Sequence, residues 1–380
     1  MKKGRLIIGV MIAVFLMAAC SDPTDPAGPK NTAGNGTGNE STVNQGSESG
    51  SSDQQGGNTN IGNPDSVWAI TAEGITIDGT LLQNTSEATV MNSAVQIIGK
   101  TNTNNYPGVF IDERTVTLSP FIMGKYEVTQ ELYKEVMTNQ KVTIGSHEYT
   151  LDAEPFLCKE TGDYPLAQGE IQKYRPADNV TWYDAVYFCN ALSEKTGLTK
   201  AYAITVTELT YDKKHITRAT VELVAGANGY RLPTEAEWEF AARGGNPSED
   251  AWDYTFSGAP TAEGKNYNDS INPGLEAVGW YCENKGLTPG THQVGKKGYN
   301  ALGIFDMSGN VKEFCYDKDG SITTGTVTDP TGPVNTKLII VIRGGCWDSY
   351  AMDCSVMQRM CTSTTGQGNT LGFRVVRKAE

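Results

Sequence analysis

Helix signals are few and short in residues 65–380, and this scarcity limits the folds that the chain can adopt. Gly, Asn, Asp and Pro recur every several residues between these signals, a pattern typical of turns. No internal repeat with the spacing of a solenoid or a propeller is present. The sequence therefore predicts an α+β fold, a single large loop-rich domain that needs extra ties such as disulfides or bound ions.

Three helices are predicted from capping residues and apolar spacing. The first begins at Thr129 and the second at Thr181, and in each the apolar residues share one face. These residues are Leu132, Tyr133, Val136 and Met137 in the first helix, and Trp182, Ala185, Val186 and Cys189 in the second. The third begins at Thr234, where Glu237 completes a capping box, and ends after Arg243 at two glycines.

Short strands are predicted over residues 75–77, 95–98, 338–342 and 373–376 from β-branched and apolar runs. The stretch 199–228 is polar and β-branched, and it predicts an inserted hairpin.

Residues 1–20 have the pattern of a bacterial lipoprotein signal peptide. Basic residues precede an apolar stretch, residues 6–17, that is too short to span a bilayer. Leu16-Met17-Ala18-Ala19-Cys20 then resembles a lipobox, in which the cysteine is lipidated and becomes the mature N-terminus. The alternative is an ordinary signal peptide with a coincidental cysteine. We therefore expect an exported protein, anchored to a bacterial membrane through Cys20, and the absence of Asp at position 21 favours the outer membrane or cell surface.

Four segments follow from this reading. Residues 1–20 are the signal peptide, and residues 21–64 form a disordered polar tether because they hold no aromatic and few apolar residues. Residues 65–99 contribute N-terminal strands that lead into the domain, and residues 100–380 form the domain itself.

The formal net charge of −13 argues against nucleic acid as the main partner. The three histidines, His147, His215 and His292, are far apart in the sequence, which argues against a histidine-rich metal site and a Ser-His-Asp set.

Several segments, in order, carry a resemblance to one known family. They are Lys125–Thr129, Val180–Ala185, Gly229–Glu239, Gly303–Phe314, Arg343–Gly345 and Leu371–Arg374. Together they cover about residues 100–380, and the ordered set resembles the formylglycine-generating enzyme (sulfatase-modifying factor) family. The resemblance implies an elaborated C-type-lectin-like fold. Many members are not formylglycine generators, so the fold leaves the function open.

The active members of this family use two nearby cysteines, copper and dioxygen to oxidise a sulfatase cysteine to formylglycine. By this resemblance Cys354 falls at the second catalytic cysteine, but Ser349 stands at the first. A hydroxyl does not replace a thiolate toward Cu(I), which prefers soft ligands. Cys346 stands where the family has a serine, so Cys346 and Cys354 could form a displaced thiol pair, form a disulfide or point to different sides.

The cysteine count adds one question. Without Cys20 seven cysteines remain, an odd number. Cys189 resembles a disulfide-bonded family cysteine, for which Cys361 is a candidate partner; several buried reduced cysteines are the alternative.

The resemblance also implies one structural calcium ion in the loop that begins at Asp306. Asp306 and Glu313 would offer carboxylates, and Gly309 and Val311 backbone carbonyls, a donor set that suits calcium. The alternative is an acidic turn in which backbone donors satisfy Glu313.

We expect a lipid-anchored lipoprotein whose domain is a non-catalytic binding or structural module for a protein or glycan ligand. The alternatives are a copper-dependent oxidase that uses Cys354 with Cys346, and an assembly or maturation factor without a redox step.

Overall fold

The computed structural model describes the backbones of the first strands, β1 (Trp68–Thr71), β2 (Gly74–Ile77), β3 (Gly79–Leu82) and β4 (Val95–Gln96). It then describes residues 108–111, 113–261, 269–286, 289–334 and 337–379. The predicted signal peptide, Cys20 and the tether lie outside the described residues. In the part of the chain that is described, no helix combines the length and the apolar character that a bilayer span requires.

The helices begin where their capping residues predict. α2 (Gln130–Met137) follows Thr129, whose side chain accepts a hydrogen bond from the Leu132 amide. Capping boxes start α3 (Trp182–Lys195), between Thr181 and Asp184, and α4 (Glu235–Ala242), between Thr234 and Glu237. Such caps satisfy amides that have no partner within the helix. A further short helix, α5 (Pro273–Val278), follows Asn272.

The strands form small separate sheets rather than one large one. The central sheet has the order β14 (Met360–Ser363), β13 (Ile339–Arg343), β11 (Lys312–Lys318) and β15 (Leu371–Gly372). A second sheet joins β12 (Gly325–Thr328), β5 (Arg114–Thr117) and β4, and a third joins β16 (Val376–Lys378), β6 (Phe121–Gly124) and β3.

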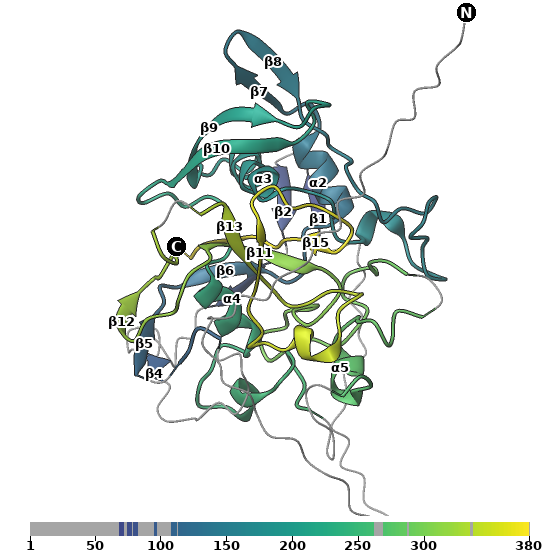
Figure 1. The fold of residues 1–380 in the computed structure, drawn as a ribbon, viewed down its shortest axis with the longest axis vertical. Coiled ribbons are helices and arrows are strands. Elements are labelled where there is room, and N and C mark those ends of the chain that lie inside the picture. Colours follow the sequence, from purple (N-terminus) through teal and green to yellow (C-terminus); the bar gives the residue numbers. More distant parts are fainter. Residues whose placement is uncertain are drawn as a thin grey trace, which may run out of the picture.

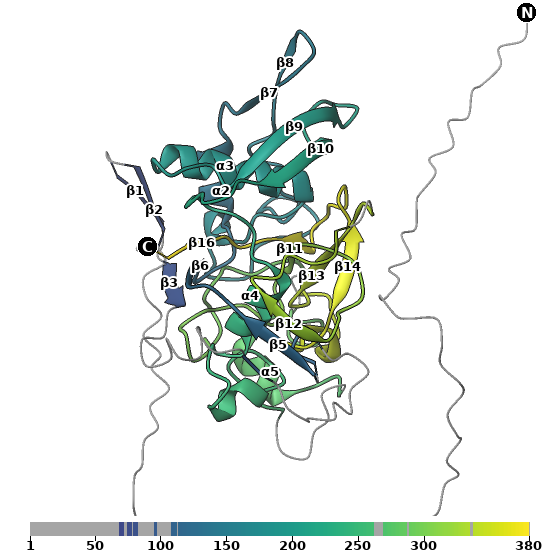
Figure 2. The same ribbon diagram turned by 90° about the vertical axis from the view of Figure 1, so that its left-hand side faces the viewer.

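Two hairpins project at one end of the molecule, beside α2 and α3 (Figures 1 and 2). They are β7 (Lys141–Ile144) with β8 (His147–Thr150), and β9 (Tyr202–Leu209) with β10 (Ile216–Leu223). The second is the hairpin predicted over 199–228, which is confirmed. α5 lies at the opposite end (Figures 1 and 2).

Three apolar clusters fill the interior. The first packs α2 and α3 against the central sheet, and the second surrounds α4, with Trp238 at its centre. The third is small and joins α5 to the segment that carries Ala351 and Cys354. The loops that connect these clusters position the candidate site.

The predicted strand over 373–376 is wrong in its extent. Phe373 and Val375 are buried, but their carbonyls accept hydrogen bonds from Val128 and Gly124 outside any regular ladder. Strand structure occurs on either side of them, in β15 and β16. The strands predicted over 75–77 and 338–342 are confirmed as β2 and β13, the latter with shifted ends. Of the strand predicted over 95–98, residues 95–96 form β4, and residues 97–98 lie outside the described residues.

Candidate functional site

The candidate site is the segment between β13 and β14 that contains Cys346, Ser349 and Cys354, here called the cysteine loop (residues 344–355). The loop leaves β13 through Gly344 and Gly345, whose φ angles of 90° and 70° suit glycine. A Cβ atom on Gly345 would lie 2.6 Å from Cys354 Sγ. Glycine thus lets the short helix η4 (Ala351–Cys354) fold back against the start of the loop.

Ser349 closes a tight turn within the cysteine loop. Its amide donates to the Cys346 carbonyl at 2.9 Å, and its Oγ accepts a hydrogen bond from the Cys346 amide at 3.1 Å. The same Oγ lies 3.3 Å from Cys346 Sγ. The Ser349 hydroxyl therefore has a structural role in this turn.

Neither thiol of the loop is accessible to solvent. Cys346 is 1% exposed and Cys354 is 0% exposed. Both are free thiols, which excludes the predicted alternative of a disulfide between them. Burial, with the nearby Cys346 as a smaller cause, raises the pKa of the Cys354 thiol well above its usual range. Because the thiolate is the metal ligand and nucleophile, this environment disfavours both functions.

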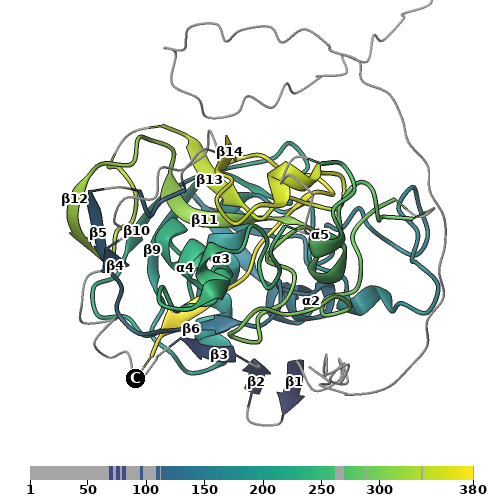
Figure 3. The ribbon, with the colours of Figure 1, turned by 90° about the horizontal axis from the view of Figure 1, so that it is seen from below.

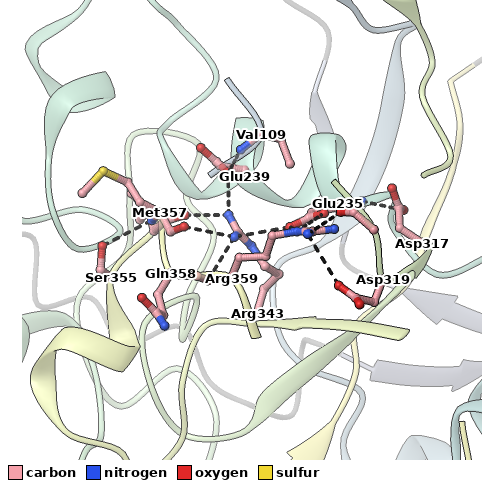
Figure 4. Close-up of polar contacts among 12 residues, drawn as sticks. Val109, Glu235, Glu239, Asp317, Asp319, Arg343, Ser355, Met357, Gln358 and Arg359 are labelled. Atoms are coloured by element: carbon pink, nitrogen blue, oxygen red, sulfur yellow. Dashed lines mark hydrogen bonds and ion pairs between the residues drawn. The ribbon is translucent and has the colours of Figure 1, made fainter. Parts of the chain in front are cut away.

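A buried ionic network underlies the loop (Figure 4). The guanidinium of Arg343 donates to Glu239 Oε2 at 2.5 Å and to the carbonyls of Val356, Met357 and Gln358. These carbonyls belong to the chain that leaves the cysteine loop, so one arginine fixes the loop's return to β14. Arginine suits this task because its planar fork carries five donors.

The outer face of the cysteine loop carries polar and aromatic side chains. Asp348 contacts Lys285, whose ammonium lies 5.1 Å from the Trp347 ring centroid. Tyr350 is 65% exposed. Asp348 and Tyr350 are thus the exposed side chains of the loop, whereas Trp347 and both thiols are buried.

The predicted calcium residues lie in and beside β11. Asp306 Oδ2 accepts a hydrogen bond from the Gly295 amide at 2.7 Å, and its Oδ1 is buried without a hydrogen-bond partner. Glu313 is paired with Arg374, which donates to both of its carboxylate oxygens, and Trp238 Nε1 donates to Oε2 at 2.9 Å. Side-chain donors, rather than backbone donors, thus hold Glu313.

A third carboxylate, Glu127, joins this cluster and was missed by the sequence analysis. Its oxygens accept from the Val311 amide at 3.1 Å and from Asn310 Nδ2 at 2.7 Å. Burial raises the pKa of Glu127 well above its usual range, and Asp306 and Glu313 raise it further. Burial likewise raises the pKa of Asp306 to about 6. Glu127 lies in the segment 125–129 beside buried apolar residues, and this position could have identified it from the sequence.

Gly309 brings the backbone of this segment close to a neighbouring loop. Its φ is 106°, and a Cβ atom there would lie 2.1 Å from the Trp280 carbonyl oxygen. In the described ranges no group of three or more His, Cys, Asp and Glu side chains could hold a metal ion. A cation here would therefore depend on at most two carboxylates, together with the backbone carbonyls of Gly309 and Val311.

The disulfide proposed between Cys189 and Cys361 is wrong, because Cys189 is a free thiol buried in the first core. Of the two readings, the structure supports buried reduced cysteines: Cys158, Cys315, Cys346 and Cys354 are also buried and free.

Comparisons with known proteins agree with this architecture. Residues 76–379 match the sulfatase-modifying factor enzyme 1-like domain. The chaperone protein LppX of Paenibacillus barcinonensis is 34% identical over 76% of this chain and 90% of its own length. The formylglycine-generating enzyme of Thermomonospora curvata is 30% identical over 69% of this chain and 83% of its own length.

Among solved structures, Treponema denticola variable protein 1 is similar, with a TM-score of 0.57 and 32% identity. The similarity covers 76% of this chain and 94% of that one. It confirms the predicted fold class, a loop-rich α+β domain of the C-type-lectin-like type.

Proposed function

Because the chain belongs to the family of sulfatase-modifying factor enzyme 1-like domains, we propose that it is a non-catalytic member of this family. In this proposal an exported lipoprotein is anchored to the membrane through Cys20, and its folded domain binds a partner polypeptide.

The observation that carries the proposal is the state of the cysteine loop. Ser349 is engaged in a turn with Cys346, and the thiols of Cys346 and Cys354 are buried and free. An oxidase would need two accessible thiolates to hold Cu(I) next to a substrate cysteine. Burial that disfavours the thiolate therefore supports a role without redox chemistry.

An oxidase assay tests this directly. The copper-loaded protein is incubated in air with a peptide that carries the sulfatase-type cysteine motif. The mass of the peptide is then measured by mass spectrometry. The Thermomonospora curvata relative, named a formylglycine-generating enzyme, serves as the positive control. We expect formylglycine with the control enzyme only; conversion of the peptide by this protein would establish the alternative, a copper-dependent oxidase.

The relative named as a chaperone supports the choice of a polypeptide as partner. On this chain the exposed face of the cysteine loop, with Asp348 and Tyr350, would make the contact. The test is the refolding yield of denatured citrate synthase diluted with the full-length protein in detergent. We expect a higher yield with the wild-type protein than with Tyr350→Ala, and a yield equal to that with serum albumin would contradict the role.

Membrane anchoring is tested by metabolic labelling with an alkyne fatty acid in a bacterial host. We expect the wild-type protein to carry the label and to sediment with membranes. Cys20→Ala should lose both properties, and a labelled Cys20→Ala variant would contradict lipidation at this residue. Sucrose-gradient separation of the two membranes then tests the outer-membrane location.

The carboxylate cluster supports a structural calcium ion. Glu127, Asp306 and Glu313 are buried near the guanidinium of Arg374, and because burial raises the pKa of Glu127 and of Asp306, a bound cation would favour their ionised forms. Asp306 Oδ1 has no hydrogen-bond partner, so it could coordinate such a cation. Asp306 and Glu313 would supply carboxylate oxygens, and Gly309 and Val311 would supply carbonyl oxygens.

A further inference from the structure

A cavity of about 440 Å³ opens on a different side of the domain from the cysteine loop. It lies where the segment from Asp317 to Pro333 folds over β5 and the start of α4. β12 and β5 lie on one side of the molecule and α5 on the other, in two perpendicular views (Figures 1 and 3). Because Ala351 and Cys354 pack with α5, the cavity and the cysteine loop are separate sites.

Arg114 of β5 is the cationic residue of this cavity. Its side chain is 6% exposed, Nη1 donates to the Val109 carbonyl at 2.9 Å, and Nε is buried without a hydrogen-bond partner. Burial lowers the pKa of this guanidinium from its usual value, although the charge persists at any ordinary pH. A buried donor on a charged group that has no partner is costly, and a bound acceptor would remove that cost.

The carboxylates near Arg114 are already engaged with other arginines (Figure 4). Glu235 accepts two hydrogen bonds from Arg359 Nε, at 2.8 and 3.0 Å. Glu239 accepts from Arg343 and from Arg243. Within the described residues, neither of these carboxylates forms an ion pair with Arg114.

Asp317 faces the same cavity and forms no ion pair with Arg114 among the described residues, although its charge, with those of Glu235 and Glu239, raises the pKa of Arg114 against the effect of burial. It is 4% exposed, and its Oδ2 accepts a hydrogen bond from the Glu235 amide at 2.8 Å. Burial and the charges of Glu235 and Glu237 raise its pKa to about 8, while Arg359 opposes this shift. Near neutral pH, Asp317 is therefore mainly a neutral carboxyl group, which can donate a hydrogen bond.

Apart from the carboxylate of Asp329, the remaining lining is mainly apolar or carries hydroxyl groups. Val109, Ala236, Ile322, Val327 and Pro330 provide apolar surface. Asp329 also lines the cavity, but both of its oxygens accept hydrogen bonds from Ser119. Such a lining suits the organic part of a ligand whose charged end meets Arg114.

We propose that this cavity binds an organic carboxylate, with Arg114 donating to the carboxylate and the side chain of Asp317 facing it. The planar guanidinium matches the two oxygens of a carboxylate. The ligand is either a small free acid or the C-terminal carboxylate of a peptide. This inference does not depend on the function proposed for the cysteine loop.

Calorimetric titration of the full-length protein in detergent at pH 6.5 tests the proposal. The small probes are butyrate and hexanoate, with butyramide and hexanamide as uncharged controls of matched size. The peptide probes are two tripeptides of identical sequence ending in leucine, one with a free and one with an amidated C-terminus. We expect binding of the free acids, of the free-ended peptide or of both, and no binding of the amides. No binding of any carboxylate at millimolar concentration, or equal binding of acids and amides, would overturn the proposal.

Two variants test whether Arg114 binds the carboxylate. Arg114→Gln should weaken binding at least about tenfold, because it removes the charged donor. Arg218→Gln, at an exposed position on the β9–β10 hairpin, should leave the affinity unchanged. Undiminished binding by a folded Arg114→Gln variant would overturn the assignment.

The pH dependence of the wild-type protein provides a test that does not require a variant to fold. Affinity should fall as the pH rises through about 8, because an ionised Asp317 repels the bound carboxylate. Asp317→Asn mimics the neutral carboxyl group, so this variant should keep its affinity for the carboxylate between pH 6.5 and pH 9. A wild-type affinity that does not change between pH 6.5 and pH 9 would contradict the role of Asp317.

Discussion

The guanidinium of Arg374 donates from Nε and Nη2 to the two carboxylate oxygens of Glu313, at 2.6 and 2.7 Å. Both side chains are 0% exposed. Arg374 also donates to the carbonyls of Gly124, Lys125 and Phe305. One ion pair therefore joins the central sheet to the end of β6 and to the loop that carries Phe305.

Removing the guanidinium of Arg374 should destabilise the domain strongly. Arg374→Met leaves Glu313 buried without its counter-charge, beside Glu127 and Asp306. Breaking a buried ion pair from one side costs about 3–5 kcal/mol. Urea unfolding followed by tryptophan fluorescence should show a loss of this size in the free energy of unfolding.

The matched control is Arg218→Met, which removes an exposed ion pair with Glu208. Its loss should be below about 1 kcal/mol. Similar small losses in both variants would show that the Glu313–Arg374 pair does not stabilise the fold as we expect. The double variant Arg374→Met with Glu313→Gln should recover part of the stability, because no uncompensated charge remains.

Asp317 should make stability fall as the pH rises. Its folded-state pKa of about 8 lies above the unfolded value near 3.9, so the folded state retains the proton to higher pH. The stabilisation is complete below the unfolded pKa and is lost between about pH 4 and pH 8. The slope from this one group is at most about 1.4 kcal/mol per pH unit.

Asp317→Asn isolates this contribution, since other groups titrate in both proteins. The free energy of unfolding of the variant minus that of the wild type should grow from pH 5 to pH 8, as measured by urea unfolding. A difference that stays constant over this range would mean that Asp317 is ionised throughout.

The sequence predicted those features of the fold that are set by local chemistry. Thr129, Thr181 and Thr234 start helices because a side-chain oxygen next to free amides is a local arrangement. The prediction of a strand over 373–376 was wrong in its extent because Arg374 and the carbonyls on either side of it form hydrogen bonds with the distant segment 124–128. Helix α5 was missed because six residues are too few to show a helical period.

The resemblance indicated the cysteine loop as the candidate site, but it did not predict the hydrogen bonding or the burial of its side chains. The motif placed Ser349 and Cys354 at the two cysteine positions of the family, and the structure shows what they do. The burial of Cys354 depends on packing against α5, which is distant in the sequence and which local sequence does not encode. The cavity beside Arg114 was even less predictable from the sequence, because its residues come from three distant segments.

Burial of the loop thiols predicts a selective pattern of alkylation. Of the free cysteines in the described residues, Cys282 is only partly buried, whereas the others are buried. Burial and the adjacent Glu283 raise the pKa of the Cys282 thiol to about 11, so its reaction should be slow but measurable. Native protein treated with iodoacetamide at pH 8 should therefore be labelled at Cys282 and not at Cys346 or Cys354.

Peptide mapping by mass spectrometry reads out the modified residues, and labelling in urea confirms that every free thiol is detectable. Cys282→Ser should remove the native label among these cysteines. Rapid labelling of Cys354 in the native protein would show that the cysteine loop opens, and it would strengthen the oxidase alternative.

Calcium should stabilise the wild-type domain through Asp306. A ligand that binds only the folded state at 100 times its dissociation constant stabilises it by about 2.7 kcal/mol, which corresponds to a rise of several degrees in the melting temperature. We expect EGTA to lower the melting temperature and calcium, but not magnesium, to restore it, because magnesium demands a tighter octahedral site. An identical melting temperature in EGTA and in calcium would count against the site.

Asp306→Asn separates a bound cation from a merely acidic turn. Asparagine keeps the oxygen that accepts from Gly295 but removes a charge that repels Glu127. In EGTA the variant should therefore be at least as stable as the wild type, while its response to calcium should be reduced or lost. Asp212→Asn, on an exposed turn, should keep the full response. If Asp306→Asn responds to calcium as the wild type does, the ion binds elsewhere, and the raised pKa of Asp306 then reflects burial of the group in its protonated form.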